Sequence, residues 1–343
     1  MSKYTALMVQ RGTAIAGCIF ALLTLTPAAW CISRQADIDE SAQSFSRVED
    51  LGLPSATATT LSHAVEIHDY LTAEKVLIPE IERDPHSTEA GRLLAFLGGI
   101  YFLNHDYLNA AVAWNKSQAI APLPDRLSFS LAMTYIRMGH SNWARKLLQS
   151  LAAKDPKQPV YPYWLGRLDY DAQQYDQAIL NFKRSIGLAP AMVRAYNNLG
   201  LCYYALNQNA QAIDNYKKAI DLDRSAAHPS AWPYLNLGIV LELMNRPEEA
   251  EVNLREAIRL EPQLAQAHFQ LGNTLEHMGK QDAAVLEFRE AARLDANYAE
   301  PHFALARLYR KLGRTSLAQQ EVNDYLRIHN QAMGGPSQDN IHP

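Results

Sequence analysis

The chain has 343 residues, of which 48% are hydrophobic and 20% are charged, and its formal net charge is -4 at pH 7. A chain of this length can bury a substantial core, and without an excess of positive charge it is a poor candidate for nucleic-acid binding. Only one of its three cysteines, Cys202, lies beyond residue 31. This cysteine content excludes a disulfide framework and a cysteine-based zinc site.

The first element in chain order is an apolar N-terminal segment. Residues 12–33 carry no charged side chain and follow Lys3 and Arg11, and a helix needs about 20 apolar residues to cross a bilayer. We therefore expect residues 1–33 to be a signal peptide or a transmembrane anchor. Positive charge before the segment predicts that the rest of the chain lies on the exoplasmic (periplasmic) side or is exported after cleavage. A cytoplasmic location remains the alternative.

An acidic linker is predicted at residues 34–56, and most of the remaining chain repeats itself. Gly166 and Gly200 are 34 residues apart, as are Gly238 and Gly272, with a four-residue insertion at 227–230 between the two pairs. Aligned on these glycines, the chain divides into seven blocks: 91–124, 125–158, 159–192, 193–226, 231–264, 265–298 and 299–332. A degenerate first unit is expected at 57–90, and a disordered tail at 333–343.

Each block is predicted to be a helical hairpin. Most apolar positions are separated by three or four residues, which is a helical period, and a polar residue or glycine near the fifteenth position divides the block into two helices. The eighth position is always Gly or Ala, whereas the twenty-fourth is large and apolar, as in Trp114, Phe182 and Tyr216. The large side chains are expected to fill the space that the small residues leave open.

The stretch "YNNLGLCYYALNQNAQAIDNYKKAIDLD", which starts at Tyr196, resembles the tetratricopeptide repeat (TPR) family. The resemblance covers about four fifths of the chain, although no block has Trp at its fourth position. It implies an all-α fold: a right-handed α-α superhelix, or solenoid, of about eight helix-turn-helix TPR units after an N-terminal hydrophobic helix. Neighbouring units would stack because one hairpin cannot bury both of its apolar faces.

The resemblance also implies a peptide-binding groove lined by the second, fifth, sixth, ninth, twelfth and thirteenth positions of each first helix. The candidate groove residues combine aromatic rings with Asn amides, which suits an extended or helical peptide. They are Phe129, Tyr163, Trp164, Arg167, Tyr170, Asn197, Asn198, Tyr204, Trp232, Asn236 and Asn273. The alternative is that the aromatics, Trp164 and Tyr170 above all, pack between adjacent helices.

Neither a catalytic motif nor a metal-ligand set stands out along the chain. There is no nucleophile motif, phosphate loop or dinucleotide fingerprint, so we expect no enzyme activity, no cofactor and no small-molecule substrate. His268 and His302 share the fourth position of successive blocks. Because no carboxylate at ligand spacing accompanies them in the sequence, no metal site is expected.

The sequence thus predicts a non-catalytic scaffold that binds a protein or peptide in its groove and organises a complex at the cell envelope. Two alternatives stay open. The repeats could belong to an accessory subunit that presents substrates to a separate catalytic partner, resembling arrays attached to glycosyltransferases or cytochrome-assembly enzymes. They could also form a structural protein that associates with copies of itself.

Overall fold

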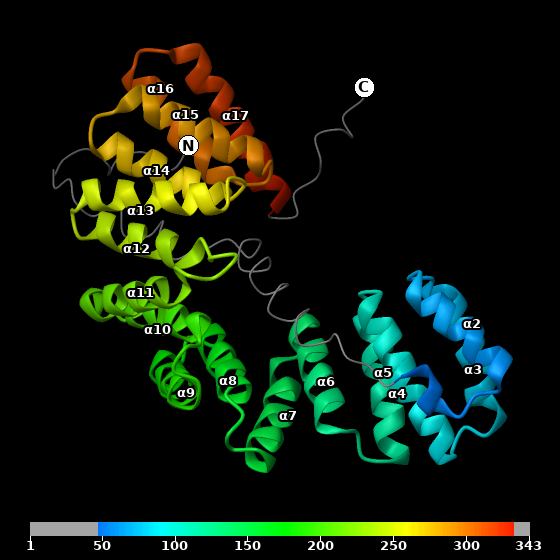
Figure 1. The fold of residues 1–343 in the computed structure, drawn as a ribbon. Coiled ribbons are helices and arrows are strands. Elements are labelled where there is room, and N and C mark those ends of the chain that lie inside the picture. The colour runs from blue at the N-terminus through cyan, green and yellow to red at the C-terminus, as the bar shows by residue number, and fades with distance from the viewer. Residues whose placement is uncertain (1–46, 333–343) are drawn as a thin grey trace, which may run out of the picture. The chain divides into compact units, whose positions relative to one another are not determined.

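The computed structural model describes residues 47–332, and the backbone there is helical throughout, with sixteen α-helices and one short 3₁₀ helix (Figure 1). The predicted all-helical class is confirmed. The N-terminal hydrophobic helix, the linker up to residue 46 and the C-terminal tail at 333–343 lie outside the described residues. None of the helices between residues 47 and 332 combines the length and apolar composition that a membrane span requires.

The helices group into two compact units, divided between Pro122 and Leu123. Unit 1 contains the 3₁₀ helix η1 (Val48–Leu51) and the helices α2 (Ser55–Glu66), α3 (Tyr70–Arg83), α4 (Thr88–Leu103) and α5 (Tyr107–Ile120). The last ten residues of the predicted linker therefore overlap structured elements. Leu51 is only 1% exposed and packs in the apolar core of unit 1, which explains why this part is ordered.

Unit 2 is a series of six hairpins. Its helices are α6 (Asp125–Arg137), α7 (Ser141–Lys154), α8 (Val160–Asp171), α9 (Tyr175–Leu188), α10 (Val193–Ala205), α11 (Asn209–Asp223), α12 (Trp232–Leu243), α13 (Pro247–Leu260), α14 (Ala265–His277), α15 (Gln281–Leu294), α16 (Ala299–Lys311) and α17 (Thr315–Ala332). The two helices of each hairpin pack together, and each second helix packs on the first helix of the next hairpin. The first helices α8, α10, α12 and α14 also contact one another in this order, so their free positions form one continuous surface.

The small residues at the eighth position bring the two helices of a hairpin together. A Cβ atom added to Gly200 would lie 2.5 Å from the ring of Tyr216, and one added to Gly272 would lie 2.6 Å from the ring of Phe288. Gly98 and Gly166 stand in the same relation to Trp114 and Phe182. The large twenty-fourth side chains thus occupy the volume that each glycine leaves empty, as the sequence predicts.

A left-handed residue ends the first helix of every predicted block. Positive φ angles between 58° and 77° occur at the fifteenth position, at His105, Gly139, Gln173, Asn207, Asn245, Gly279 and Gly313. This conformation reverses the chain sharply enough for the second helix to fold back, and glycine adopts it without steric cost. The polar or glycine break in the sequence therefore marks the turn.

Candidate functional site

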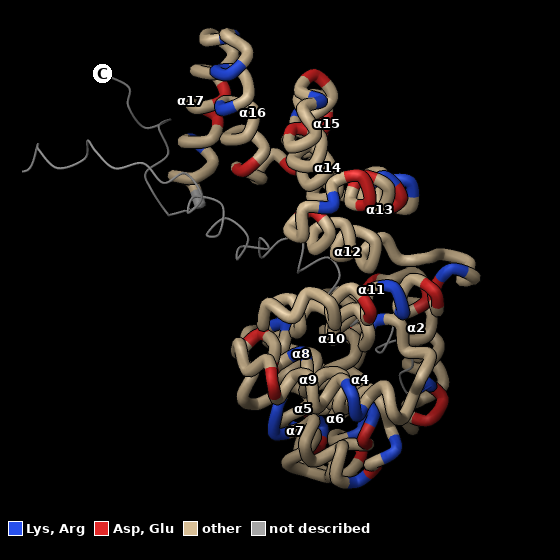
Figure 2. Tube along the Cα trace, turned by 90° about the vertical axis from the view of Figure 1, so that its left-hand side faces the viewer, with Lys and Arg blue, Asp and Glu red and all other residues tan. Residues whose placement is uncertain are grey.

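The first helices in the middle of unit 2 carry very few charges. Within α10 the single charged residue is Arg194, and within α12 it is Glu242, whereas α13 alone carries six. Figure 2 shows this contrast as a mainly tan α12 beside a red and blue α13. A surface built on α10 and α12 therefore presents polar and aromatic side chains more than charges.

Five of the predicted groove residues are buried. Tyr163 is 0% exposed, and Trp164, Phe129, Arg167 and Asn236 are also buried. Tyr163 packs against the ring of Phe182 from the second helix of its own hairpin, and the ring of Phe129 lies against that of Tyr161 from the next first helix. In this structure these side chains hold helices together, as the packing alternative describes.

Six other predicted residues remain partly exposed, and we call the surface they form the first-helix face. They are Tyr170, Asn197, Asn198, Tyr204, Trp232 and Asn273. Tyr170, Tyr204 and Trp232 rest on the apolar core of unit 2 with part of each side chain accessible. Burial raises the pKa values of the Tyr170 and Tyr204 hydroxyls, so both stay neutral at physiological pH.

Hydrogen bonds join the face to the buried residues beneath it. Asn198 Nδ2 donates to the Tyr163 hydroxyl at 3.1 Å, and Arg167 donates to the same oxygen at 3.2 Å. Asn236, which is buried, donates to Asn197 Oδ1 at 3.0 Å and so links α12 to α10. The structure therefore brings Tyr163, Arg167 and Asn198 together in one group, and Asn197 and Asn236 in another.

The remaining residue, Asn273, lies apart from these groups. Its side-chain amide donates to Gln270 on the same helix, α14, at 3.4 Å. The structure shows no hydrogen bond from Asn273 to α12 within residues 47–332. Its place on the face rests on the helical period alone.

Arg194 and Asp169 were missed by the sequence analysis. The Arg194 guanidinium lies 4.9 Å from the centre of the Tyr163 ring, and Arg194 occupies the second position of its block, a position that the groove pattern includes. Asp169 is 0% exposed and accepts hydrogen bonds from Arg145 on α7 and Asn181 on α9. The sequence gives no sign of this group, because its partners lie 24 and 12 residues away along the chain.

A cleft of about 540 Å³ lies outside the first-helix face, between α11 and α13. Its walls mix charged side chains such as Lys217 and Glu249 with apolar ones such as Val252.

The only cysteine among the described residues, Cys202, is buried, and burial raises the pKa of its thiol, so it is a poor nucleophile.

Each of the two histidines at the fourth position has a carboxylate partner, contrary to the sequence analysis. His268 Nδ1 lies 2.7 Å from Glu287, and His302 Nδ1 lies 2.7 Å from Glu321. In both hairpins the glutamate comes from the second helix, 19 residues after the histidine. The turn between the two helices of the hairpin brings the two positions together, and a search for closely spaced ligands along the sequence does not detect this.

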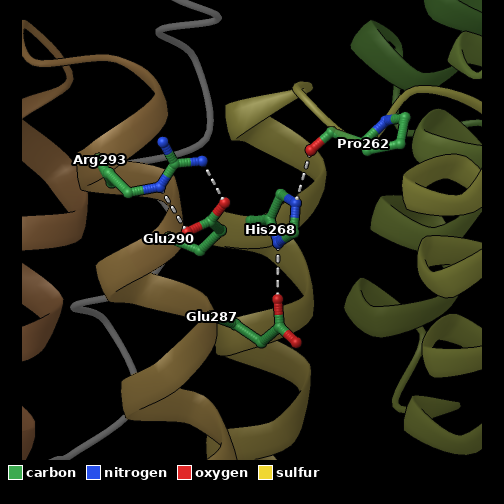
Figure 3. A network of polar contacts seen from close by, with 5 residues as sticks. All are labelled: Pro262, His268, Glu287, Glu290 and Arg293. Atoms are coloured by element: carbon green, nitrogen blue, oxygen red, sulfur yellow. Dashed lines mark hydrogen bonds and ion pairs between the residues drawn. The ribbon is translucent and has the colours of Figure 1, made fainter.

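His268 sits in a network of acceptors (Figure 3). Its Nε2 faces the Pro262 carbonyl oxygen at 3.1 Å, while its Nδ1 faces Glu287. Burial lowers the pKa of His268, but the hydrogen bonds to Glu287 and to the Pro262 carbonyl outweigh burial, and the pKa is raised overall. Since both ring nitrogens meet groups that only accept, the charged imidazolium satisfies this site best.

This network predicts a pH-dependent stability. A histidine whose pKa is raised by folding stabilises the protein fully below its unfolded pKa, about 6.5, and this contribution is lost as pH rises through the folded pKa. We expect His268→Gln to cost more stability at pH 5.5 than at pH 9. Urea unfolding of both proteins at the two pH values measures the difference, and an equal cost at both would show that folding does not raise the pKa of His268.

Comparison with known proteins shows which proteins this architecture is similar to. The described residues form an all-helical solenoid of stacked hairpins. Residues 191–262 and 235–299 match models described as tetratricopeptide repeat. Together these matches span residues 191–299, so this part of the chain is similar to tetratricopeptide repeats.

Similar proteins share parts of the chain. An uncharacterised TPR repeat-containing protein of Arabidopsis thaliana is 33% identical over 82 residues, which are 23% of this chain and 10% of that protein. Protein bimA of Emericella nidulans is 26% identical over 175 residues, or 50% of this chain and 21% of its own length. The chain thus spans well under two thirds of the curated relatives that it matches.

Among solved structures, a tetratricopeptide repeat protein from Parabacteroides merdae superposes with a TM-score of 0.60 at 15% identity. The superposition covers 80% of this chain and 99% of that one. At this identity the likeness establishes the fold alone.

Proposed function

We propose that unit 2 binds an extended protein or peptide segment on the first-helix face and acts as a non-catalytic scaffold. TPR proteins are generally protein-interaction scaffolds, which supports the proposal at the level of the class. The observation that carries it here is the set of partly exposed aromatic and amide side chains on the first helices, of which α10 and α12 carry one charged residue each.

The chemistry of the face suits a peptide backbone with apolar side chains. Tyr204 and Trp232 can remove apolar groups of a ligand from water, and large aromatic rings dominate binding energy at such surfaces. Asn197 accepts from Asn236, while its own amide nitrogen donates to no residue within 47–332 and can donate to a ligand carbonyl. Because the amides are joined to buried residues, they are held in place before a ligand arrives.

Replacing Trp232 with Ala is expected to weaken binding by about 2 kcal/mol, or roughly thirtyfold, while leaving helicity intact. A photoreactive p-benzoylphenylalanine at position 204 would capture the partner in cells, and the yield of the adduct with and without Trp232→Ala measures the loss. The matched control is Val252→Ala, because Val252 is 68% exposed on α13, away from the face.

The crosslink also separates the proposal from self-association. A discrete adduct from position 204, but none from the same probe at 252, agrees with a ligand on the first-helix face. An adduct made of two copies of this chain would contradict the scaffold proposal and favour the structural oligomer.

We also propose that the scaffold acts at the cell envelope. The support is the uncharged segment at residues 12–33 with Lys3 and Arg11 before it. Alkaline phosphatase fused after residue 56 in a bacterial host should be active, because that enzyme needs an oxidising compartment for its disulfides. An inactive fusion, with β-galactosidase active at the same position, would place the repeats in the cytoplasm.

A further inference from the structure

The last hairpin brings one histidine and two carboxylates together. His302 lies on α16, and Glu321 and Asp324 lie on α17, three residues apart and therefore on one face of that helix. One ligand atom of each residue lies within 4.8 Å of those of the other two. All three side chains are partly exposed, so the group is open to solvent.

The preceding hairpin has the same arrangement 34 residues earlier. There the side chains are already engaged with one another and with Arg293, and we call this hairpin closed. There His268, Glu287 and Glu290 correspond to the three residues, and Arg293 corresponds to Arg327. Both nitrogens of His268 are engaged, and Arg293 holds Glu290 through two hydrogen bonds of 2.6 and 2.8 Å (Figure 3). Both ring nitrogens of His268 and both carboxylate oxygens of Glu290 are therefore already engaged.

In the last hairpin the corresponding contacts are fewer, and the one from arginine is longer. Ala296 stands where the earlier hairpin has Pro262, and within residues 47–332 His302 makes no hydrogen bond except the one to Glu321. Asp324 is one methylene shorter than Glu290 and meets Arg327 through a single contact of 3.1 Å. The four equivalent positions, one histidine, two carboxylates and one arginine, thus make more hydrogen bonds in the closed hairpin than in the last one.

We propose that His302, Glu321 and Asp324 bind a divalent transition-metal cation of the Zn²⁺ type. Imidazole nitrogen and carboxylate oxygen are ligands that Zn²⁺ takes at about 2.0–2.2 Å, which sets ligand atoms roughly 3–4 Å apart. The three groups are already near this spacing and need only small side-chain rotations, with Asp324 leaving Arg327. The bound cation would tie α16 to α17 and stabilise the last hairpin by mass action.

A titration of the full chain with Co²⁺, a spectroscopic substitute for Zn²⁺, tests the site. We expect one equivalent to bind with visible ligand-field absorption, Zn²⁺ to displace it and Mg²⁺, which avoids imidazole, to leave it in place. His302→Ala and Glu321→Gln should each weaken Co²⁺ binding about tenfold or more. Arg327→Gln should strengthen Co²⁺ binding, because the Arg327 guanidinium no longer competes with the metal for Asp324.

The closed hairpin supplies the matched controls, and circular dichroism checks that each variant is folded. His268→Ala and Arg293→Gln should leave Co²⁺ affinity unchanged. If they shift it as much as the variants of the last hairpin do, or if His302→Ala has no effect, the site is not the one proposed. Should His302→Ala fail to fold, the Arg327→Gln result decides: unchanged or weaker affinity overturns the proposal.

Discussion

Replacing Arg145 with Ala is expected to lower the free energy of unfolding by about 3 kcal/mol, because it leaves a buried carboxylate without its charged partner. Asp169 is fully buried and bridges α7, α8 and α9 through Arg145 and Asn181. With Arg145 gone, Asn181 alone would satisfy the charge. Urea unfolding followed by tryptophan fluorescence measures the loss.

An exposed ion pair between α6 and α7 provides the control. Lys154 and Asp125 are separated by 2.7 Å, but their side chains are 58% and 50% exposed. Lys154→Ala should therefore cost less than about 1 kcal/mol. The double variant Arg145→Met with Asp169→Leu should be more stable than Arg145→Ala alone, because apolar groups replace both charges. Equal costs for Arg145→Ala and Lys154→Ala would mean that Asp169 is hydrated and carries no such penalty.

The second large effect is expected from Gly200→Leu, which should destabilise the protein by about 3 kcal/mol through overpacking. The new Cβ would lie 2.5 Å from the Tyr216 ring, and the ring is fully buried and cannot move into solvent. Gly187→Leu is the matched control, because a Cβ at Gly187 on α9 meets nothing within 4 Å. Thermal unfolding of both variants compares them.

The repeats themselves suggest a rescue. Where the eighth position is Ala, the twenty-fourth is a smaller side chain: Leu148 accompanies Ala132, and Val322 accompanies Ala306. Gly200→Ala should therefore be better tolerated in a chain that also carries Tyr216→Leu than in one that keeps Tyr216. If the tyrosine makes no difference, the two positions are energetically independent, and the volume argument is wrong.

The hairpins and their packing could be predicted because they depend on local periodicity. A 34-residue period, a small eighth residue and a break at the fifteenth are all visible within one block, and each has a direct structural counterpart. The helical class therefore needed no knowledge of contacts between blocks. The N-terminal segment and the C-terminal tail remain predictions from composition.

The candidate site could be predicted only in part, because exposure depends on neighbouring hairpins. The groove pattern selects positions on the first helices, but it cannot tell that Tyr163 is covered while Trp232 stays accessible. That difference is set by Phe182, Arg194 and Asn198, which pack around Tyr163 from two other helices. The histidine–glutamate pairs were missed for the same reason, since each partner sits on a different helix.

The left-handed turn residues are positions where the stability of the fold could be increased. His105, Gln173, Asn207 and Asn245 all adopt a backbone conformation that costs a residue with a Cβ atom about 1 kcal/mol, less for asparagine. Each turn lies at a hairpin tip, away from the packed glycines at the eighth position. An engineer could therefore raise the heat stability of the array one tip at a time, without altering its packed interior.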